Sequence, residues 1–364
     1  MGSNVGLVSY GTFIPRYRIG VEEILRVWNN FFAEILKEQL MVSERVVLSP
    51  DQDTLTLAFE AARQALGRVD LPDEALGGVY LGTCTSPWDT RPAATALAEM
   101  LGLTGFRSCS DLQFSTKSGT AALQMAWAMV ASGALENALA VGSDVLNRHV
   151  APGTLQEYSA SSAAAAFVVG RDPARVIAEI APFTSFVSDL SDTFRVSGER
   201  YIRSGGLSAL ESGIGFLEHI GHAVRAHLKR DGLDLKQFDY AVFQQPVGVV
   251  PVALALQFGM GMDQVTPGLV AYELGDLGSA SVGVGLATIL DQAEPGQKIL
   301  LASYGSGAGA DVTVLTVTEN ITGYRRAGLA VEDQIQDKEM VDYATAMKYE
   351  GKYAKVEHAL TAWL

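Results

Sequence analysis

The sequence repeats its own plan at a fixed offset. A shift of 161 residues places Leu81 on Val242, and both lie inside similar apolar runs. The same shift places Thr116 on Leu277, next to Asp276. A period of about 160 residues is far longer than that of solenoid repeats and indicates a duplicated domain. A fold made of two similar halves is therefore the first expectation for this chain.

Strand-like and helix-like runs alternate within each half. Buried strands are expected at 5–15, 77–86, 136–145 and 163–170, and again at 238–246 and 297–309. Helices are expected at 53–69, 118–133, 212–232 and 278–296. Helix 118–133 is apolar nearly all round, which predicts a buried helix. Alternation of this kind is typical of layered α/β proteins.

Two halves related by a pseudo-two-fold axis bring equivalent ends together. The carboxyl ends of strands and the amino ends of helices then face one central cleft, where α/β proteins bind ligands. Four places are expected there, namely Thr83–Cys84, Ser115–Thr116, Gln244–Gln245 and Asp276–Leu277. Each place carries polar or thiol side chains that can take part in chemistry.

Composition excludes several classes of protein. The 364 residues are 48% hydrophobic, and the net charge of −14 disfavours nucleic acid and anionic membranes as partners. The apolar runs are too short to span a bilayer. Two cysteines, Cys84 and Cys109, indicate neither a disulfide framework nor a zinc site. We therefore expect a cytoplasmic protein without a metal of its own.

Several motifs resemble a known superfamily. The phrases "GLVSYGTFIPRYRI", "DTLTLAFEAARQAL", "SGTAALQ" and "ASYGSGAGAD" are similar to those of short archaeal and bacterial 3-hydroxy-3-methylglutaryl-CoA (HMG-CoA) synthases, members of the thiolase superfamily. The phrases "YLGTCTSPWDTRPAA", "ERYIRSG", "AVFQQP", "GDLGSAS" and "ALTAWL" resemble one branch more closely. That branch is the synthase-like subunit of bacterial monoacetylphloroglucinol (2,4-diacetylphloroglucinol) acetyltransferases, enzymes of secondary metabolism.

The resemblance maps the superfamily's catalytic positions onto the same four places. Active synthases carry a Cys in F-A-C-K-A-G-T, and residues 114–120 read "FSTKSGT", which puts Thr116 at the nucleophile position. The synthase Glu in G-x-E becomes Cys84, and the His before x-Pro becomes Gln244. The Asn in G-N-x-G-x-A-S becomes Asp276. All four positions hold a residue that differs from the synthase residue.

These replacements weaken the synthase chemistry. A Thr hydroxyl is far less acidic than a Cys thiol and needs a close base. Gln244 cannot accept a proton as His does, and an ionised Asp276 would repel a developing oxyanion. We expect a degenerate site, with Ser115 and Thr116 as caps of the helix start. The alternative is an active enzyme that uses Ser115 or Thr116 as an unusual nucleophile.

The resemblance also implies an assembly. It implies the duplicated thiolase fold in layers α-β-α-β-α, with halves at 1–172 and 173–322 and an extension at 323–364. The extension either packs on its own domain or serves as a docking arm. The implied partners are a second copy of this chain, a thiolase-like subunit that supplies the catalytic Cys, and a small zinc-containing OB-fold (DUF35-type) subunit. Any zinc is expected on that small subunit.

Overall fold

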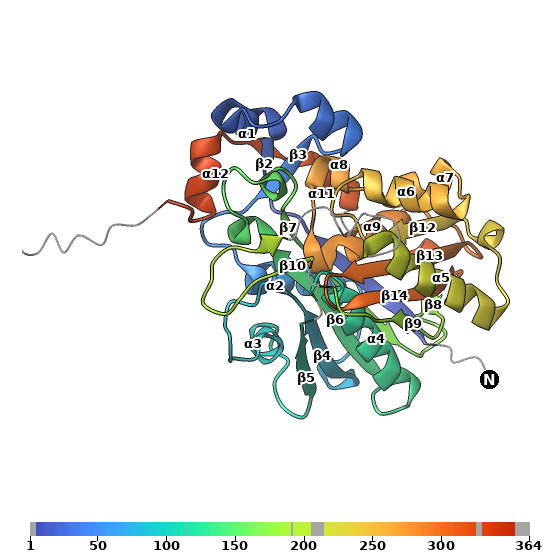
Figure 1. Cartoon of the computed structure of the whole chain (residues 1–364). Helices are drawn as coiled ribbons and strands as arrows, with labels where there is room; N and C mark the ends of the chain where they lie inside the picture. Colours follow the sequence, from blue (N-terminus) through green and yellow to red (C-terminus); the bar gives the residue numbers. More distant parts are fainter. Residues whose placement is uncertain (1–4, 114, 191, 205–214, 325–329, 354–364) are drawn as a thin grey trace, which may run out of the picture.

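A large mixed sheet runs through the molecule (Figure 1). The computed structural model describes residues 5–113, 115–190, 192–204, 215–324 and 330–353. Within these residues the sheet has ten strands. Nine of them follow the order β12 (Tyr240–Phe243), β13 (Lys298–Gly305), β14 (Gly309–Val317), β8 (Ala178–Ile180), β1 (Gly6–Phe13), β7 (Ser162–Gly170), β6 (Asn137–Val145), β4 (Leu76–Gly82) and β5 (Ser108–Leu112). The tenth, β9 (Thr184–Phe186), pairs with β14.

The strand order repeats outward from the contact between β1 and β8. The strands β1, β7, β6 and β4 follow one another on one side, and β8, β14, β13 and β12 follow on the other. In each half the first two pairings are antiparallel and the third is parallel. The two halves therefore share one topology, as the sequence offset predicted.

Strand β7 explains the long apolar runs in the sequence. Side chains alternate between the two faces of a strand. The side chains of Ala163, Ala165, Phe167 and Val169 belong to a central core, whereas Ala164, Ala166 and Val168 belong to an outer core. Because both faces of this strand are buried, its sequence is apolar at nearly every position.

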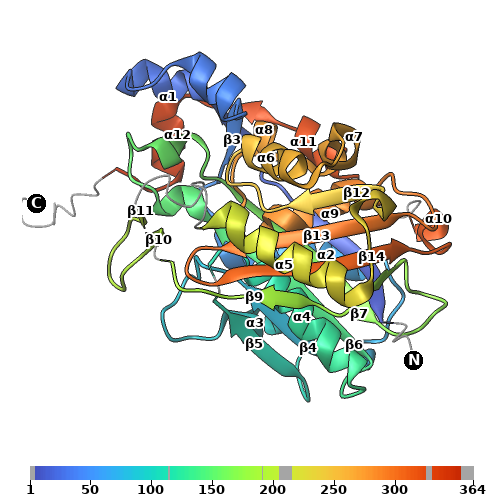
Figure 2. The same cartoon turned by 45° about the vertical axis from the view of Figure 1, so that its right-hand side comes forward.

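Helices cover both faces of each half, as Figures 1 and 2 show. The central core contains helices α4 (Ser118–Ala131) and α9 (Ser281–Leu290) together with strands from both halves. The outer helices are α2 (Thr54–Gly67) and α3 (Ala93–Met100) on the first half and α5 (Phe216–Asp231) and α6 (Val249–Phe258) on the second. The predicted α-β-α-β-α layering of a thiolase-like fold is confirmed.

Local sequence fixes the ends of the outer helices. The Asp53 carboxylate accepts hydrogen bonds from the backbone N–H groups of Leu55 and Thr56, which caps the start of α2. Gly232 ends α5 in the left-handed conformation, with φ of 65°. A residue with a Cβ adopts that conformation less readily, so glycine suits this C-cap.

Two expectations for the central helices need correction. Helix α4 is not buried all round, because Met125 on its outer face is 40% exposed. Helix α9 spans only Ser281–Leu290, shorter than the expected 278–296, because Gly278–Ala280 forms a 3-10 turn before it. A run of small apolar residues is compatible with a helix over its whole length, so it does not indicate where the helix begins or ends.

A separate small sheet packs the extension onto the body of the protein. Strand β15 (Glu339–Met340) pairs with β2 (Tyr17–Gly20), which pairs with β3 (Glu44–Val47). Helix α12 (Tyr343–Tyr349) packs against α1 (Val21–Trp28), as Figure 1 shows. Residues 330–353 therefore pack on their own chain. The final residues, including "ALTAWL", lie outside the described part.

The remaining elements are short. They are β10 (Thr193–Phe194), β11 (Arg203–Ser204), α7 (Met262–Val265), α8 (Ala271–Leu274), α10 (Ile321–Tyr324) and α11 (Val331–Gln336). The β10–β11 hairpin lies beside the cavity described below. In the described part of the chain, every helix is too short or too polar to cross a membrane.

Candidate functional site

The five residues selected from the sequence line one cavity of about 500 Å³. They are Cys84, Ser115, Thr116, Gln244 and Asp276. The first three come from the end of β4 and the start of α4, and the last two from the end of β12 and the turn before α9. The convergence of strand ends and helix starts from both halves is thus present in the structure.

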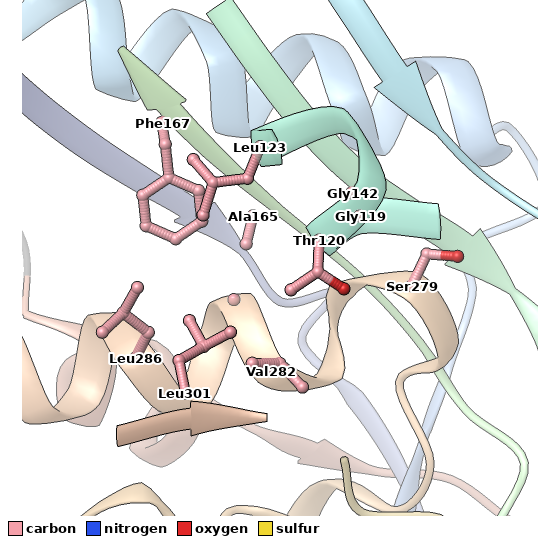
Figure 3. A pocket seen from close by; sticks show the side chains of 11 residues that line it. Gly119, Thr120, Leu123, Gly142, Ala165, Phe167, Ser279, Val282, Leu286 and Leu301 are labelled. Carbon is pink, nitrogen blue, oxygen red and sulfur yellow. The ribbon is translucent and has the colours of Figure 1, made fainter. Parts of the chain in front are cut away.

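Close backbone packing holds the two helix starts together. A Cβ added to Gly119 would lie 2.1 Å from the carbonyl oxygen of Ser279, and one added to Gly142 would lie 2.4 Å from the same oxygen. Figure 3 shows these glycines beside Ser279 and Thr120. Any side chain at Gly119 or Gly142 would push the turn before α9 away from α4. Glycine at these positions therefore sets the distance between the halves.

The hydroxyl of Thr116, the residue that we expected at the nucleophile position, is already engaged. Its Oγ1 donates a hydrogen bond to the carbonyl oxygen of Tyr304, at 2.9 Å. A hydroxyl has only one proton to donate. Neighbouring Ser115 has a φ of 52°, an uncommon left-handed conformation for serine. This backbone turn presents both residues to the cavity.

The predicted capping role of Ser115 and Thr116 is wrong. Helix α4 begins at Ser118, its N-cap residue is Lys117, and no side chain caps it. The Lys117 ammonium instead forms a buried ion pair with Asp311, with Nζ and Oδ2 2.7 Å apart. The pair joins the start of α4 in the first half to β14 in the second, so Lys117 holds the two halves together.

Asp144, at the end of β6, organises the floor of the site and was missed from the sequence. Its Oδ1 accepts hydrogen bonds from the Thr83 hydroxyl (2.8 Å), the Cys84 N–H (2.9 Å) and the Thr85 hydroxyl (2.7 Å). Its Oδ2 accepts from the Ser279 N–H (2.7 Å), the Ser279 hydroxyl (2.5 Å) and the Cys84 thiol (3.3 Å). The position of Asp144 near the end of the apolar run "ENALAVGSDV" was the available signal, because buried carboxylates require partners.

Cys84 is held as a thiol. Burial and, after it, the nearby charge of Asp144 raise the pKa of the Cys84 thiol well above its usual value. A thiolate, and not a thiol, is the reactive nucleophile. Cys84 is therefore poorly suited to act as a nucleophile at neutral pH.

Asp276 titrates close to neutrality. Burial raises the pKa of its carboxyl group to about 7, and Asp144 adds to the rise, although the hydrogen bond from the Gly278 N–H opposes it. That N–H lies 2.9 Å from Oδ1. Near pH 7 the Asp276 side chain is therefore present both as a neutral acid and as a carboxylate, which the sequence alone did not indicate.

Gln244 is fixed against the same turn. Its Nε2 donates a hydrogen bond to the carbonyl oxygen of Gly278, at 2.9 Å. Because Gly278 also donates to Asp276, this one residue orients both side chains. The remaining oxygen of the Gln244 amide can accept a hydrogen bond but cannot act as a base at neutral pH.

The lining also contains polar residues that the sequence did not predict. The Tyr304 hydroxyl donates to Asp192 Oδ2 at 3.1 Å, and burial raises the pKa of Asp192. Arg195 lines the cavity as well. Asp192 and Arg195 flank β10, whereas Tyr304 lies near the end of β13. His149 lies outside the lining, and burial lowers the pKa of its imidazole.

The described lining of the cavity places no imidazole or amine base beside the Thr116 hydroxyl. Among the described residues that line it, none is a histidine or a lysine. The titratable acids are Asp192 and Asp276, and the hydroxyl at the nucleophile position bonds to a backbone carbonyl. A strong nucleophile with an adjacent base is the usual requirement for covalent acyl transfer.

Known structures share this fold. The structure titled "MvaS in complex with 3-hydroxy-3-methylglutaryl coenzyme A" matches with a TM-score of 0.86, at 22% identity over 99% of this chain and 94% of that chain. The curacin biosynthetic pathway HMG synthase in complex with holo donor-ACP matches with a TM-score of 0.83, at 22% identity over 95% of this chain and 88% of that one. These matches show that the chain has the mixed α/β, thiolase-like fold of HMG-CoA synthase structures.

Sequence comparison identifies the family. The chain is 40% identical to the hydroxymethylglutaryl-CoA synthase of Methanothermobacter thermautotrophicus over 347 residues, which are 95% of this chain and 98% of the relative. It is also 40% identical to the synthase of Pyrobaculum aerophilum, over 95% of this chain and 97% of that protein. No protein-family model matches the chain. The chain belongs to the hydroxymethylglutaryl-CoA synthase family.

Proposed function

We propose that this chain is a catalytically silent, structural subunit of a multi-component C-acyltransferase. In this proposal the complex moves acetyl groups between phloroglucinol-type aromatics. A thiolase-like partner supplies the catalytic Cys, and a small zinc-containing OB-fold subunit completes the assembly. This chain forms a homodimer and carries no metal or other cofactor of its own, and the complex is cytoplasmic.

The observation that carries the proposal is the state of Thr116. Its hydroxyl donates to the Tyr304 carbonyl, and the lining beside it contains Gln244 where a base is required. A Thr hydroxyl without a base does not form an acyl intermediate at a useful rate. Cys84 stands where the resemblance places a Glu, and Asp276 stands where it places an Asn. Four replaced residues at one site support the proposal that this chain itself does not catalyse acyl transfer.

The test uses the complete complex with both hydroxyls removed. Ser115→Ala combined with Thr116→Ala in this chain should leave the acetyl transfer rate within about threefold of the unmodified complex, since changes away from reacting groups are small. Replacement of the reactive Cys in the thiolase-like partner serves as the matched control and should abolish transfer. A loss of orders of magnitude in the double variant would overturn the proposal.

A second candidate function rests on the relatives. Proteins at 40% identity over nearly the whole chain are named as hydroxymethylglutaryl-CoA synthases. An active acyltransferase that uses Ser115 or Thr116 as nucleophile is the corresponding alternative. It predicts a covalent acetyl group on the peptide with these residues after incubation with acetyl-CoA. Mass spectrometry of the wild-type chain, with the double alanine variant as control, separates the two functions.

A further inference from the structure

The cavity that remains in this chain is built mainly from apolar and aromatic side chains. Its aliphatic lining includes Leu36, Leu146, Val150, Leu155, Ile202 and Val247. Its aromatic lining consists of Tyr158, Phe194, Phe216 and Tyr304 among the described residues. A volume of about 500 Å³ is in the range of pockets that enclose small organic ligands.

The charges in the cavity disfavour anionic ligands. Two acids, Asp192 and Asp276, line it, and Arg195 is the cationic residue among the described lining. The Arg195 guanidinium also donates to the carbonyl oxygen of Glu199, at 3.2 Å. Phosphate groups and dicarboxylates require clusters of cations or of N–H donors. The cavity therefore suits a neutral molecule better than a free dicarboxylate.

The polar floor offers hydrogen-bond acceptors to a ligand. Asp276 Oδ1 accepts from the Gly278 N–H, and Gln244 Nε2 donates to the Gly278 carbonyl oxygen. The second carboxyl oxygen of Asp276 and the amide oxygen of Gln244 are then the polar atoms that remain on these two lining residues. Hydroxyl groups of a ligand are natural donors to both oxygens.

We propose that this cavity binds a neutral, hydroxylated aromatic ketone, with its ring between the apolar walls and its hydroxyl groups at Asp276 and Gln244. The proposal rests on the proposed function, because such phenols are the aromatics that the complex would acetylate. The new element is that this chain binds the aromatic ligand although it does not catalyse the transfer. The bound molecule is not covalently changed in this cavity.

Isothermal titration calorimetry on the full-length chain tests the proposal with two probes. Monoacetylphloroglucinol is the neutral phenolic ketone, and 3-hydroxy-3-methylglutarate is a dianion of similar size. We expect monoacetylphloroglucinol to bind with one site per chain and at least tenfold more tightly than the dianion. Absence of binding by the phenol, or equal binding of both probes, would overturn the proposal.

Variants locate the bound ligand. Val150→Trp fills the apolar part of the cavity, and Asp276→Ala with Gln244→Leu removes the two acceptors from the floor. Each change should weaken binding of monoacetylphloroglucinol at least tenfold. Glu99→Gln on exposed α3 is the matched control and should bind as the wild type does. Unchanged affinity in the floor variant, whose far-ultraviolet circular dichroism shows it to be folded, contradicts the assigned position.

The two proposals fail in different ways. If the chain does not bind monoacetylphloroglucinol but the complex still transfers acetyl groups after Ser115→Ala and Thr116→Ala, this inference is overturned and the proposed function stands. If binding is present but that complex loses transfer, the chain has a catalytic hydroxyl and the silent role is overturned instead.

Discussion

A single carboxylate at Asp144 determines how the floor of the cavity is arranged. It accepts hydrogen bonds from four neighbouring residues, three at the end of β4 and one at the turn before α9. Asp144 is completely buried, so these bonds replace its lost hydration. Because the donors come from both halves of the molecule, Asp144 also fixes the halves relative to each other.

Replacement of Asp144 should therefore destabilise the protein strongly. Asp144→Asn keeps one acceptor oxygen and replaces the other with an NH₂ group. The donors that faced the second oxygen then face another donor and lose their acceptor. We expect a loss of about 2–4 kcal/mol in the free energy of unfolding, since buried donors left without acceptors cost about 1–3 kcal/mol each. Urea denaturation measures the loss. The exposed Asp189→Asn is the control, with a change of less than about 0.5 kcal/mol. A change below 1 kcal/mol at Asp144 would contradict this account.

Asp276 makes the stability depend on pH. Its folded pKa of about 7 lies above the unfolded value of 3.8. Between these values the folded state holds a proton that the unfolded state has lost, so stability falls as pH rises from about 4 to 7 and is level above that range. Asp276→Asn removes this dependence. The variant should gain stability relative to the wild type as pH rises. The gain should be roughly 1.4 kcal/mol for each unit by which the folded pKa of Asp276 exceeds its unfolded pKa.

Thermal unfolding of the wild type and of Asp276→Asn at a series of pH values measures this effect. The difference in melting temperature should be near zero at pH 4 and reach its full size by pH 8. A constant difference across that range would show that Asp276 is ionised in the folded protein from low pH onward. The control is Asp263→Asn, because Asp263 is an exposed carboxyl group on the surface.

At the residue scale the sequence predicted positions better than roles. The 161-residue offset correctly brought Cys84, Thr116, Gln244 and Asp276 to one place, because strand ends and helix starts follow from topology. It did not predict that Thr116 bonds to a carbonyl or that Asp276 titrates near neutrality. Those properties depend on burial and on contacts across the duplication, as with Asp144, and no local pattern contains them.

At the element scale, a buried ion cluster attaches the extension to the cavity wall. The Arg45 guanidinium on β3 pairs with the Glu350 carboxylate at the end of α12, and both side chains are fully buried. Arg45 also donates to the carbonyl oxygen of Glu157, at 2.7 Å. Glu157 belongs to the 3-10 turn Leu155–Tyr158, and the other three residues of this turn line the cavity. The extension thus supports the site from behind.

Loss of the Glu350 charge should destabilise the whole protein. Glu350→Gln leaves Arg45 buried without its carboxylate. It also removes the nearer partner of Lys352, whose Nζ lies 2.9 Å from Glu350 Oε2 and 3.8 Å from Glu157 Oε1. Removal of one partner of a buried ion pair typically costs about 3–5 kcal/mol. Guanidinium denaturation should show a loss in this range, with no comparable loss for the exposed Glu99→Gln. A loss under 1 kcal/mol would mean that water or another anion compensates Arg45.

The sequence predicted the repeated elements but not this added region. Strands such as β7 and helices such as α2 carry clear periodicity and caps. The sheet of β2, β3 and β15 joins residues more than 290 positions apart, with two residues of β15 paired to β2. Such short, distant pairings leave no periodic pattern, so the sequence left both the docking and the packed alternatives open for the extension.

At the scale of the whole molecule, close packing and a buried ion pair hold the two halves together around the cavity. Gly119 and Gly142 hold α4 against the turn before α9, and Lys117 with Asp311 ties the halves. These contacts concern folding and do not require a nucleophile. The chain can therefore keep this geometry whichever side chains stand at the four positions that line the cavity.

Restoration of the nucleophile and its base should partly restore acyl chemistry. Thr116→Cys puts a thiol at the start of α4, and Gln244→His puts an imidazole on the same cavity, where one ring nitrogen can keep the hydrogen bond to the Gly278 carbonyl oxygen. An imidazole nearby lowers the pKa of a thiol and makes it nucleophilic. We expect the double variant, incubated with acetyl-CoA, to gain one acetyl group, seen by intact-protein mass spectrometry.

The single variant Thr116→Cys is the matched control for this restoration. Its thiol faces a cavity with two acids and no imidazole among the described lining residues, so most of it stays protonated at neutral pH. Acetylation should therefore be at least tenfold slower in the single variant than in the double variant. Equal rates would show that the helix start alone activates the thiol. If both variants stay unmodified, the barrier lies in how the cavity receives the acyl donor, which agrees with its few cationic groups and with a neutral aromatic as its ligand.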